Sequence, residues 1–306
     1  SSPGIVVGLL LALGWPVAAQ TGPVEATLNG LRLAFDRDTG GLVRMEHAGP
    51  GTFLDATPAR AGLVDLAYPL PAFEPLRLAP RFSSGARIEV SADEVVLSWD
   101  ALGASRPLAL EGRVGATVRF RAAPDGRSVI LTCRVANESP RPVRQVVFPD
   151  LAGLLPIAGA DHTKFTTGGF ASTPFRDLRP EEERLSAMYL TDAGGFSAEY
   201  RGGGLFHPMV MRWMDLGGLR GGVSLFPKRW GWDPQVTVRL HLSEVEAKLR
   251  LLCVHPLEVP TGQSWESGEF WLTPHAQGWA RGIEPYREWG GVRDMRSYRY
   301  GRRMIR

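Results

Sequence analysis

Residues 117–136 read TVRFRAAPDGRSVILTCRVA, and this stretch decides the fold class. Apolar and polar residues alternate on both sides of the segment Ala123-Pro124-Asp125-Gly126. Alternation with a period of two is typical of strands with one buried face, and Pro-Asp-Gly is typical of a tight turn. The stretch therefore predicts an antiparallel hairpin that joins residues 117–121 to residues 128–136.

The same pattern recurs along the chain. Leu31, Leu33 and Phe35 would share one strand face before a turn at 38–41. Residues 236–242 and 249–253 predict another hairpin, residues 269–272 a last strand, and residues 180–188 a short helix in a less regular region. With 36 Gly and 24 Pro in 306 residues, turns must be frequent. Because no βαβ rhythm is present, the sequence predicts an all-β fold, a large antiparallel β-sandwich.

The first residues predict export. An apolar run at 5–13 is followed by Val17-Ala18-Ala19 before Gln20, which matches the hydrophobic core and cleavage site of a secretory signal peptide. The run is too short for a stable membrane span. We expect a signal peptide at 1–19 whose start is truncated, a sandwich domain at 20–277, and a secreted or periplasmic protein.

Two features of composition bear on partners and redox state. Six Arg and one Asp at 293–306 give the tail a charge of +5, so the rest of the chain sums to −2. We interpret this tail as a solvated linker and expect no nucleic-acid partner, although its charge alone would suit one. Export would permit a disulfide between Cys133 and Cys253, but two buried free thiols are the favoured alternative.

Two segments near the end of the chain carry a resemblance to known proteins. Residues 207–216 read HPMVMRWMDL and are followed by GGVSLF at 221–226, while residues 278–289 read GWARGIEPYREW. With the early hairpin at 36–42, they resemble the N-terminal domains of barrel glycoside hydrolases of the α-galactosidase-like and endo-α-N-acetylgalactosaminidase-like group. The resemblance implies a galactose-mutarotase-like β-supersandwich whose closing helix leads into a catalytic (β/α)8 barrel, which is absent from these residues.

The closing helix is expected to have one aromatic face and a break at its proline. A helical face with spacings of four, three and three residues is formed by Trp279, Ile283, Tyr286 and Trp289. Proline within a helix costs about 3 kcal/mol, so we expect a break near Glu284 and a new first turn at Pro285. We expect the aromatic face to seal the sandwich and residues 278–306 to form this helix and a basic linker toward the missing domain.

Aromatic rings and carboxylates are the side chains that suit a sugar ligand. The carbohydrate-binding candidates are Trp213, Asp215, Trp230, Trp232 and Asp233. Each has a structural alternative: the tryptophans also suit a sandwich core, and Asp215 also suits the turn at 217–218.

Catalytic residues cannot be read from spacing on a β-fold, because partner residues can be far apart in sequence. The catalytic candidates are His162, His207 and Asp215, since histidine titrates near neutral pH and a carboxylate can act as acid or base. No His or Cys spacing resembles a metal site and no phosphate-binding loop follows a strand, so we expect no metal and no cofactor.

The sequence therefore predicts a non-catalytic, carbohydrate-associated N-terminal domain of an exported glycoside-hydrolase-like protein, with carbohydrate and the missing barrel as its partners. One alternative is a stand-alone sugar 1-epimerase, which would need a histidine facing a carboxylate across a cleft. Another is a structural or interaction module in which the tryptophans are buried.

Overall fold

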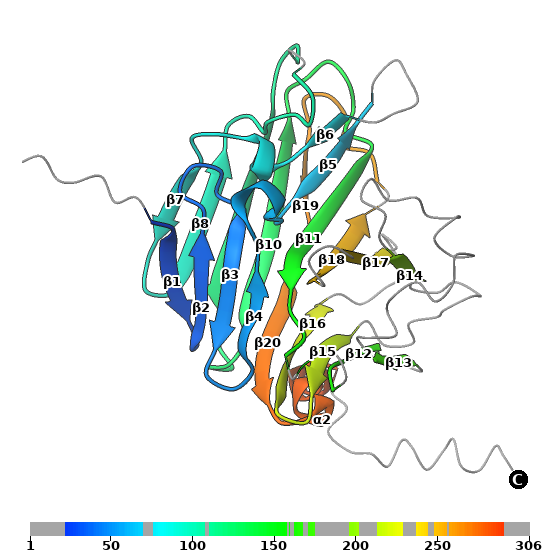
Figure 1. Cartoon of the computed structure of the whole chain (residues 1–306). Coiled ribbons are helices and arrows are strands. Elements are labelled where there is room, and N and C mark those ends of the chain that lie inside the picture. Colours follow the sequence, from blue (N-terminus) through cyan, green and yellow to red (C-terminus); the bar gives the residue numbers. More distant parts are fainter. Residues whose placement is uncertain are drawn as a thin grey trace, which may run out of the picture.

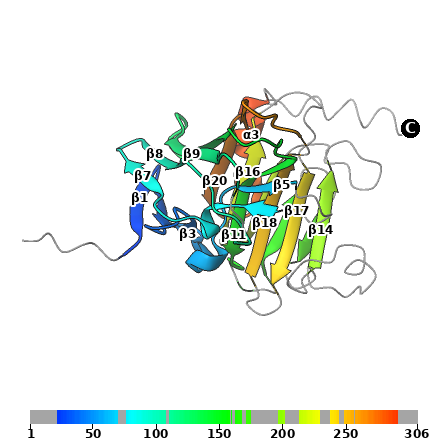
Figure 2. The ribbon, with the colours of Figure 1, turned by 90° about the horizontal axis from the view of Figure 1, so that it is seen from above.

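The computed structural model describes residues 22–69, 76–107, 110–157, 159, 162–167, 171–174, 196–201, 213–228, 237–243, 248–255 and 257–290. Within these residues the chain forms two ten-stranded sheets (Figures 1 and 2) in which every paired strand is antiparallel to its neighbour. The all-β, antiparallel sandwich predicted from the sequence is confirmed.

The first sheet contains, in order across the sheet, β1 (Val24–Leu28), β2 (Leu31–Phe35), β3 (Leu42–His47), β4 (Gly51–Asp55), β11 (Gln145–Leu154), β18 (Lys248–His255), β17 (Thr237–Ser243) and β14 (Phe196–Arg201). A side branch joins β5 (Asp65–Tyr68) to β11, and β6 (Leu76–Leu78) to β5. Two 3-10 turns, η1 (Pro58–Arg60) and η2 (Pro80–Phe82), flank this branch.

The second sheet contains β13 (Ala171–Pro174), β12 (Lys164–Thr167), β15 (Met214–Gly218), β16 (Gly221–Pro227), β20 (Phe270–Ala276), β10 (Val129–Asn137), β9 (Val114–Ala122), β8 (Glu94–Trp99) and β7 (Arg87–Val90), with β19 (Ser264–Glu266) beside β10. It contains the hairpin predicted first, β9–β10, which pairs in continuous register from Val114–Asn137 to Ala122–Val129. The predicted hairpins β2–β3 and β17–β18 are also confirmed.

The main core lies between the two sheets and is formed by the apolar residues that alternate along their strands. In β10, for example, Leu131, Cys133 and Val135 are buried in this core, while Arg134 points to the other face. Cys133 and Cys253 are both buried and unpaired, and burial raises the pKa of each thiol. The alternative of two buried free thiols is therefore confirmed.

A second, smaller core lies on the outer face of the second sheet and is covered by two short helices, α2 (Trp279–Gly282) and α3 (Glu284–Trp289). The chain breaks between them at Ile283, and Pro285 occupies the first turn of α3, as the sequence predicted. Phe226 is fully buried at the centre, with ring centroids 5.3 Å from Tyr286 and 6.0 Å from Trp289. As expected, the aromatic residues of α2 and α3 cover this side of the sandwich, except that Trp279 remains 54% exposed.

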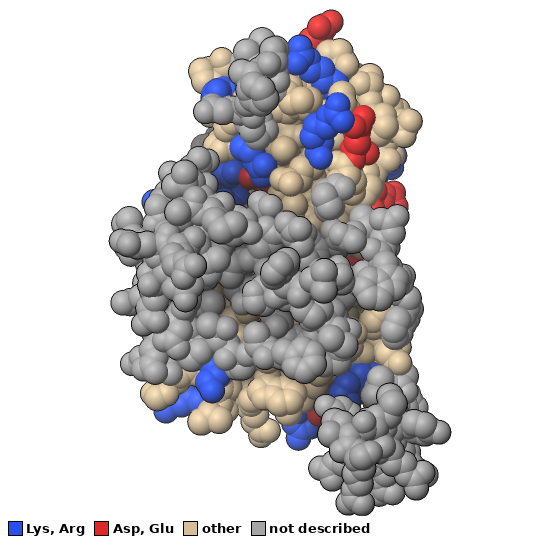
Figure 3. All heavy atoms as spheres, turned by 90° about the vertical axis from the view of Figure 1, so that its right-hand side faces the viewer, with Lys and Arg blue, Asp and Glu red and all other residues tan. Residues whose placement is uncertain are grey.

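None of the described helices is long and apolar enough to cross a membrane. On the face shown in Figure 3, the described Lys and Arg side chains lie in separate groups toward the upper and lower ends of the molecule, with Asp and Glu close to the upper group.

Candidate functional site

A network of five charged side chains lies on the first sheet, on the face turned away from the second sheet. Its acidic members are Asp150 in β11 and Asp65 in β5, and Arg250 comes from the neighbouring strand β18. Arg250 alternates with core residues along β18, which directs its side chain to the outer face. Arg77 in β6 and Arg81 in η2 complete the network from the segment that covers this face.

The two carboxylates are bound almost entirely by guanidinium groups. Arg250 donates from Nε to Oδ1 of Asp150 over 2.7 Å and from Nη2 to Oδ2 over 2.5 Å. Arg81 Nη2 donates to Oδ2 of Asp65 over 2.5 Å, and Arg77 Nη2 lies 2.7 Å from Oδ1 of Asp65. The paired contact of Arg250 with Asp150 is of the strongest kind of hydrogen bond in proteins, whereas Oδ1 of Asp65 is buried and accepts no hydrogen bond among the described residues.

This arrangement keeps Asp150 ionised. Burial alone would raise the pKa of Asp150, but the charge and hydrogen bonds of Arg250, with smaller contributions from Arg81 and Arg77, outweigh burial and lower it. The same two carboxylates raise the pKa of Arg250. An ionised carboxylate whose oxygens are already occupied cannot serve as a general acid, and it is poorly placed to serve as a base.

The arginines leave the network with capacity for one more acceptor. Three guanidinium groups and two carboxylates sum to a charge of +1. Nη1 of Arg81 is buried, lies 3.9 Å from Oδ2 of Asp150, and has no hydrogen-bond partner among the described residues. The side chains of Arg77 and Arg250 are 29% and 26% exposed. The site can therefore donate hydrogen bonds to an oxygen-rich ligand from a preorganised set of guanidinium groups.

A second polar cluster lies at the other end of the fold and involves one predicted residue, Asp215. Its Oδ1 lies 2.7 Å from Nε2 of His275, and both side chains are buried. Nδ1 of His275 lies 3.1 Å from the Gln277 carbonyl, which can only accept, so Nδ1 carries a hydrogen. Burial raises the pKa of Asp215, and the hydrogen bond with His275 acts in the opposite direction.

Helix α2 seals this pair from solvent. A Cβ atom added to Gly282 would lie 2.7 Å from Nε2 of His275 and 2.9 Å from Oδ1 of Asp215, so the backbone of the helix rests directly on both groups. The Gly282 carbonyl also accepts hydrogen bonds from the indole of Trp213 over 3.1 Å and from the hydroxyl of Ser224 over 2.8 Å. Trp213 is 1% exposed. In this structure the Trp-Met-Asp strand anchors the closing helix.

Of the other predicted site residues, His162 is described by the structure, and it joins neither cluster. His162 is exposed, and its backbone N–H donates to the Gly159 carbonyl over 3.1 Å. His207, Trp230, Trp232 and Asp233 lie outside the described residues, so their roles stay predictions. No group of three or more metal-ligating side chains occurs in the described part of the chain.

Sequence reasoning missed the network on the first sheet. A signal was present, because Asp150 interrupts the apolar run VVFPDLAGLL and Arg250 interrupts KLRLLCVH. A charge within a strand that is buried on both faces requires a partner. The sequence does not identify that partner, since the two residues are one hundred positions apart.

The sequence matches no protein-family model and no curated protein. Solved structures do match. The chain is similar to a family 36 α-galactosidase, AgaB of Geobacillus stearothermophilus, with a TM-score of 0.52 and 11% identity over 88% of this chain and 42% of that chain. It is also similar to the Slr1438 protein of Synechocystis sp. PCC 6803, with a TM-score of 0.50 and 11% identity over 85% of this chain and 98% of that one. The fold is the galactose-mutarotase-like sandwich.

A galactose mutarotase related enzyme of Lactobacillus acidophilus gives a TM-score of 0.47, with 11% identity over 83% of this chain and 98% of that chain. The chain thus spans less than half the length of the α-galactosidase and nearly the whole length of the two shorter proteins. The fold implied by the resemblance is confirmed, and the catalytic barrel stays a prediction.

Proposed function

We propose that this chain is a carbohydrate-binding or carbohydrate-framing domain of a glycoside-hydrolase-like protein, and that it does not itself cleave glycosidic bonds. The observation that carries this proposal is the charge network on the first sheet. It offers the partly exposed guanidinium groups of Arg77 and Arg250 to a ligand rich in hydroxyl groups. Hydrogen bonds from a charged donor are stronger than those between neutral groups, so sugar oxygens are favourable acceptors for these guanidinium groups.

The same network argues against hydrolysis at this site. Glycosidases use one carboxylic acid that holds a proton and a second, free carboxylate. Here Asp65 and Asp150 are each bound by guanidinium groups, and the pKa of Asp150 is lowered, which is the reverse of what a general acid requires. The Asp215–His275 pair lies beneath helix α2 and leaves no room for a sugar ring.

Binding and catalysis can be tested together on the purified chain. We expect binding on a glycan array, no release of nitrophenol from a panel of nitrophenyl glycosides, and no catalysed change in optical rotation of fresh monosaccharide solutions. Robust hydrolysis would contradict the proposal. Catalysed mutarotation would favour the sugar 1-epimerase alternative, and the absence of any glycan binding would favour a structural module.

A pair of variants tests whether the network is the binding site. Arg77→Ala removes a partly exposed guanidinium and leaves Asp65 paired with Arg81, so the fold should persist. We expect it to weaken glycan binding about tenfold, the value of one charge-assisted hydrogen bond. Arg44→Ala is the matched control, because Arg44 is an exposed arginine ion-paired with Glu46, away from the network. Equal effects of the two variants would contradict this location.

We also propose that the chain is exported and that it works beside a catalytic barrel. The signal peptide expected at 1–19 lies outside the described residues, so support comes from its sequence pattern alone. N-terminal sequencing of the protein recovered from its source should give a mature start near Gln20. The coding sequence that follows Arg306 should continue with alternating strands and helices.

A further inference from the structure

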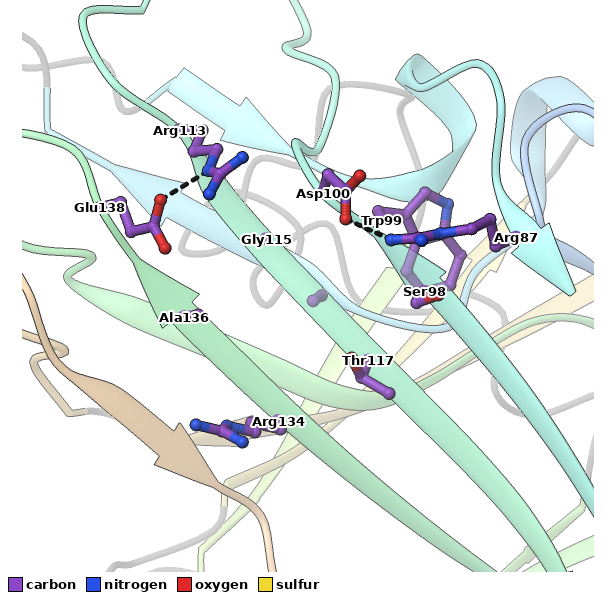
Figure 4. A pocket seen from close by; sticks show the side chains of 11 residues that line it. Arg87, Ser98, Trp99, Asp100, Arg113, Gly115, Thr117, Arg134, Ala136 and Glu138 are labelled. Carbon is purple, nitrogen blue, oxygen red and sulfur yellow. Dashed lines mark hydrogen bonds and ion pairs between the residues drawn. The ribbon is translucent and has the colours of Figure 1, made fainter. Parts of the chain in front are cut away.

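A shallow pocket of about 240 Å³ lies on the second sheet, on its outer face and among strands β7, β8, β9 and β10 (Figure 4). In the sheet order, β20 lies between these four strands and the strands β15 and β16 under the closing helices. Every residue that lines it belongs to the described part of the chain. Neither the proposed binding site nor the closing helices use this surface.

One row of paired residues forms the lower part of the pocket. The register aligns Arg87 with Ser98, Ser98 with Thr117, and Thr117 with Arg134 across the four strands. Two hydroxyl groups are thus placed between two arginines. Neighbouring strands are about 4.8 Å apart, so the two arginine backbones lie about 14 Å apart, a span that a sugar ring and its substituents can bridge.

The pocket is hollow because the neighbouring row has almost no side chains. Gly115 pairs with Ala136 in the register, where long polar side chains normally cover an exposed sheet face. A third arginine, Arg113, lies at the upper end and is held by Glu138 (Figure 4). Arg87 is held at its edge by Asp100 over 2.5 Å. These ion pairs orient their guanidinium groups beside the hollow.

Arg134 differs from the other arginines on this face. Arg119 is ion-paired with Glu94, and Arg121 with Glu269. For Arg134, no carboxylate lies within ion-pairing distance among the described residues, and its Nη2 lies 3.4 Å from the Ser264 hydroxyl. The lining sums to +1, from three arginines and two carboxylates. Glu266 on β19 is the cross-strand neighbour of Arg134 but forms no ion pair with it, so the guanidinium is available to an anionic group in the pocket.

We propose that this pocket binds an acidic saccharide unit, with the sugar carboxylate on Arg134 and the sugar hydroxyls on Ser98 and Thr117. Guanidinium groups bind carboxylates through two parallel hydrogen bonds. A volume of about 240 Å³ is below the roughly 300–1,000 Å³ of pockets that enclose drug-sized ligands, which fits one sugar unit of a longer chain. The anionic group follows from the arginines alone, whereas the saccharide rests on the proposed function.

The test is a titration of the intact chain with methyl β-glucuronide, methyl β-glucoside and sodium sulfate, followed by backbone amide shifts. We expect the glucuronide to shift the amides of Thr117 and Arg134 and to bind about tenfold more tightly than the glucoside, as expected for one charge-assisted interaction. Equal affinity for glucuronide and glucoside would overturn the proposal. Equal affinity for glucuronide and sulfate would overturn the assignment to a saccharide.

Three variants locate the site. Arg134→Ala should weaken glucuronide binding about tenfold, and Ala136→Tyr should abolish it by filling the hollow without a change in charge. Arg119→Ala on the neighbouring strand is the control and should have no effect, because Arg119 lies outside the pocket and is paired with Glu94. All three residues lie on a sheet surface, so the fold should persist, which the amide spectrum reports directly. If Arg134→Ala binds as wild type does, the proposal is wrong.

This inference and the proposed function fail in different ways. If the first-sheet network does not bind sugar, Arg77→Ala leaves glycan binding unchanged while Arg134→Ala still weakens glucuronide binding. If the outer pocket does not bind sugar, the reverse pattern appears. If the amide shifts of Thr117 and Arg134 do not respond to the glucuronide at all, this inference is overturned whatever the glycan array shows.

Discussion

Replacement of Arg250 by methionine should be the most informative test of the charge network. Arg250 supplies two hydrogen bonds to Asp150, over 2.7 and 2.5 Å, and a weaker one to Asp65 over 3.5 Å. Methionine keeps much of the buried volume but leaves the carboxylate of Asp150 without its main partner. Loss of one partner of a buried ion pair costs about 3–5 kcal/mol. We expect a decrease of this size in the free energy of unfolding at pH 7.

The pH dependence separates an electrostatic cause from a packing cause. In the wild type the pKa of Asp150 is lowered. The ionised carboxylate therefore contributes fully to the free energy of unfolding above its unfolded pKa of about 3.9, and this contribution is lost as the pH falls through the lowered pKa of the folded state. Without Arg250, burial is opposed only weakly and should raise the pKa of Asp150 above 3.9. The variant then gains stability as the pH falls through that raised value. The difference in the free energy of unfolding between the wild type and Arg250→Met should therefore decrease toward pH 4.

Urea denaturation, monitored by tryptophan fluorescence at pH 7 and at pH 4.5, measures this difference in the free energy of unfolding. Arg119→Met is the matched control, since Arg119 forms an exposed ion pair with Glu94 whose loss should cost about 0–1 kcal/mol at either pH. A penalty below 1 kcal/mol for Arg250→Met, or a penalty equal at both pH values, would refute the reasoning.

Three further predictions concern the rest of the fold. Phe226→Ala empties the second core and should cost about 3–5 kcal/mol, with faster amide exchange in α3; unchanged exchange would contradict the role of α3 as a seal. Cys133 and Cys253 should not react with a thiol reagent under native conditions, because burial raises both pKa values, and both should react in urea; rapid native labelling would contradict their burial. Gly62→Ala should destabilise the protein, since its Cβ would lie 2.2 Å from the Asp150 carbonyl oxygen, and an unchanged melting temperature would contradict this close approach.

The hairpins could be predicted because their signals are local. In 117–136 the alternation identifies the buried face, and the Pro-Asp-Gly turn fixes where the chain reverses. The break before Pro285 was predictable for the same reason, since the ring of proline is incompatible with a helix interior whatever surrounds it. Trp279 shows the limit of this approach. Its spacing places it on the aromatic face, yet α2 ends after four residues and the side chain is left largely exposed.

The charge network could not be assembled from the sequence, because it depends on which strands become neighbours. Asp65 reaches it through β5, which pairs with β11, and Arg81 through a 3-10 turn beyond β6. No local pattern places β18 beside β11, where Arg250 pairs with Ala152 and reaches Asp150 diagonally. Individual charges in apolar strands could be recognised from the sequence, but their partners could not.

The position of Asp215 changes the meaning of the sequence resemblance. The Trp-Met-Asp strand and the closing helix were two separate segments in the sequence. In the structure they form one unit, because Trp213 and Ser224 donate to Gly282, and Asp215 binds His275 directly beneath it. A buried donor that loses its acceptor costs about 1–3 kcal/mol, so a change in either segment affects the other. The two segments are therefore better explained as the attachment of the closing helix to the sandwich than as a sugar-binding motif. We expect ligand contacts at the arginines on the outer faces of the two sheets.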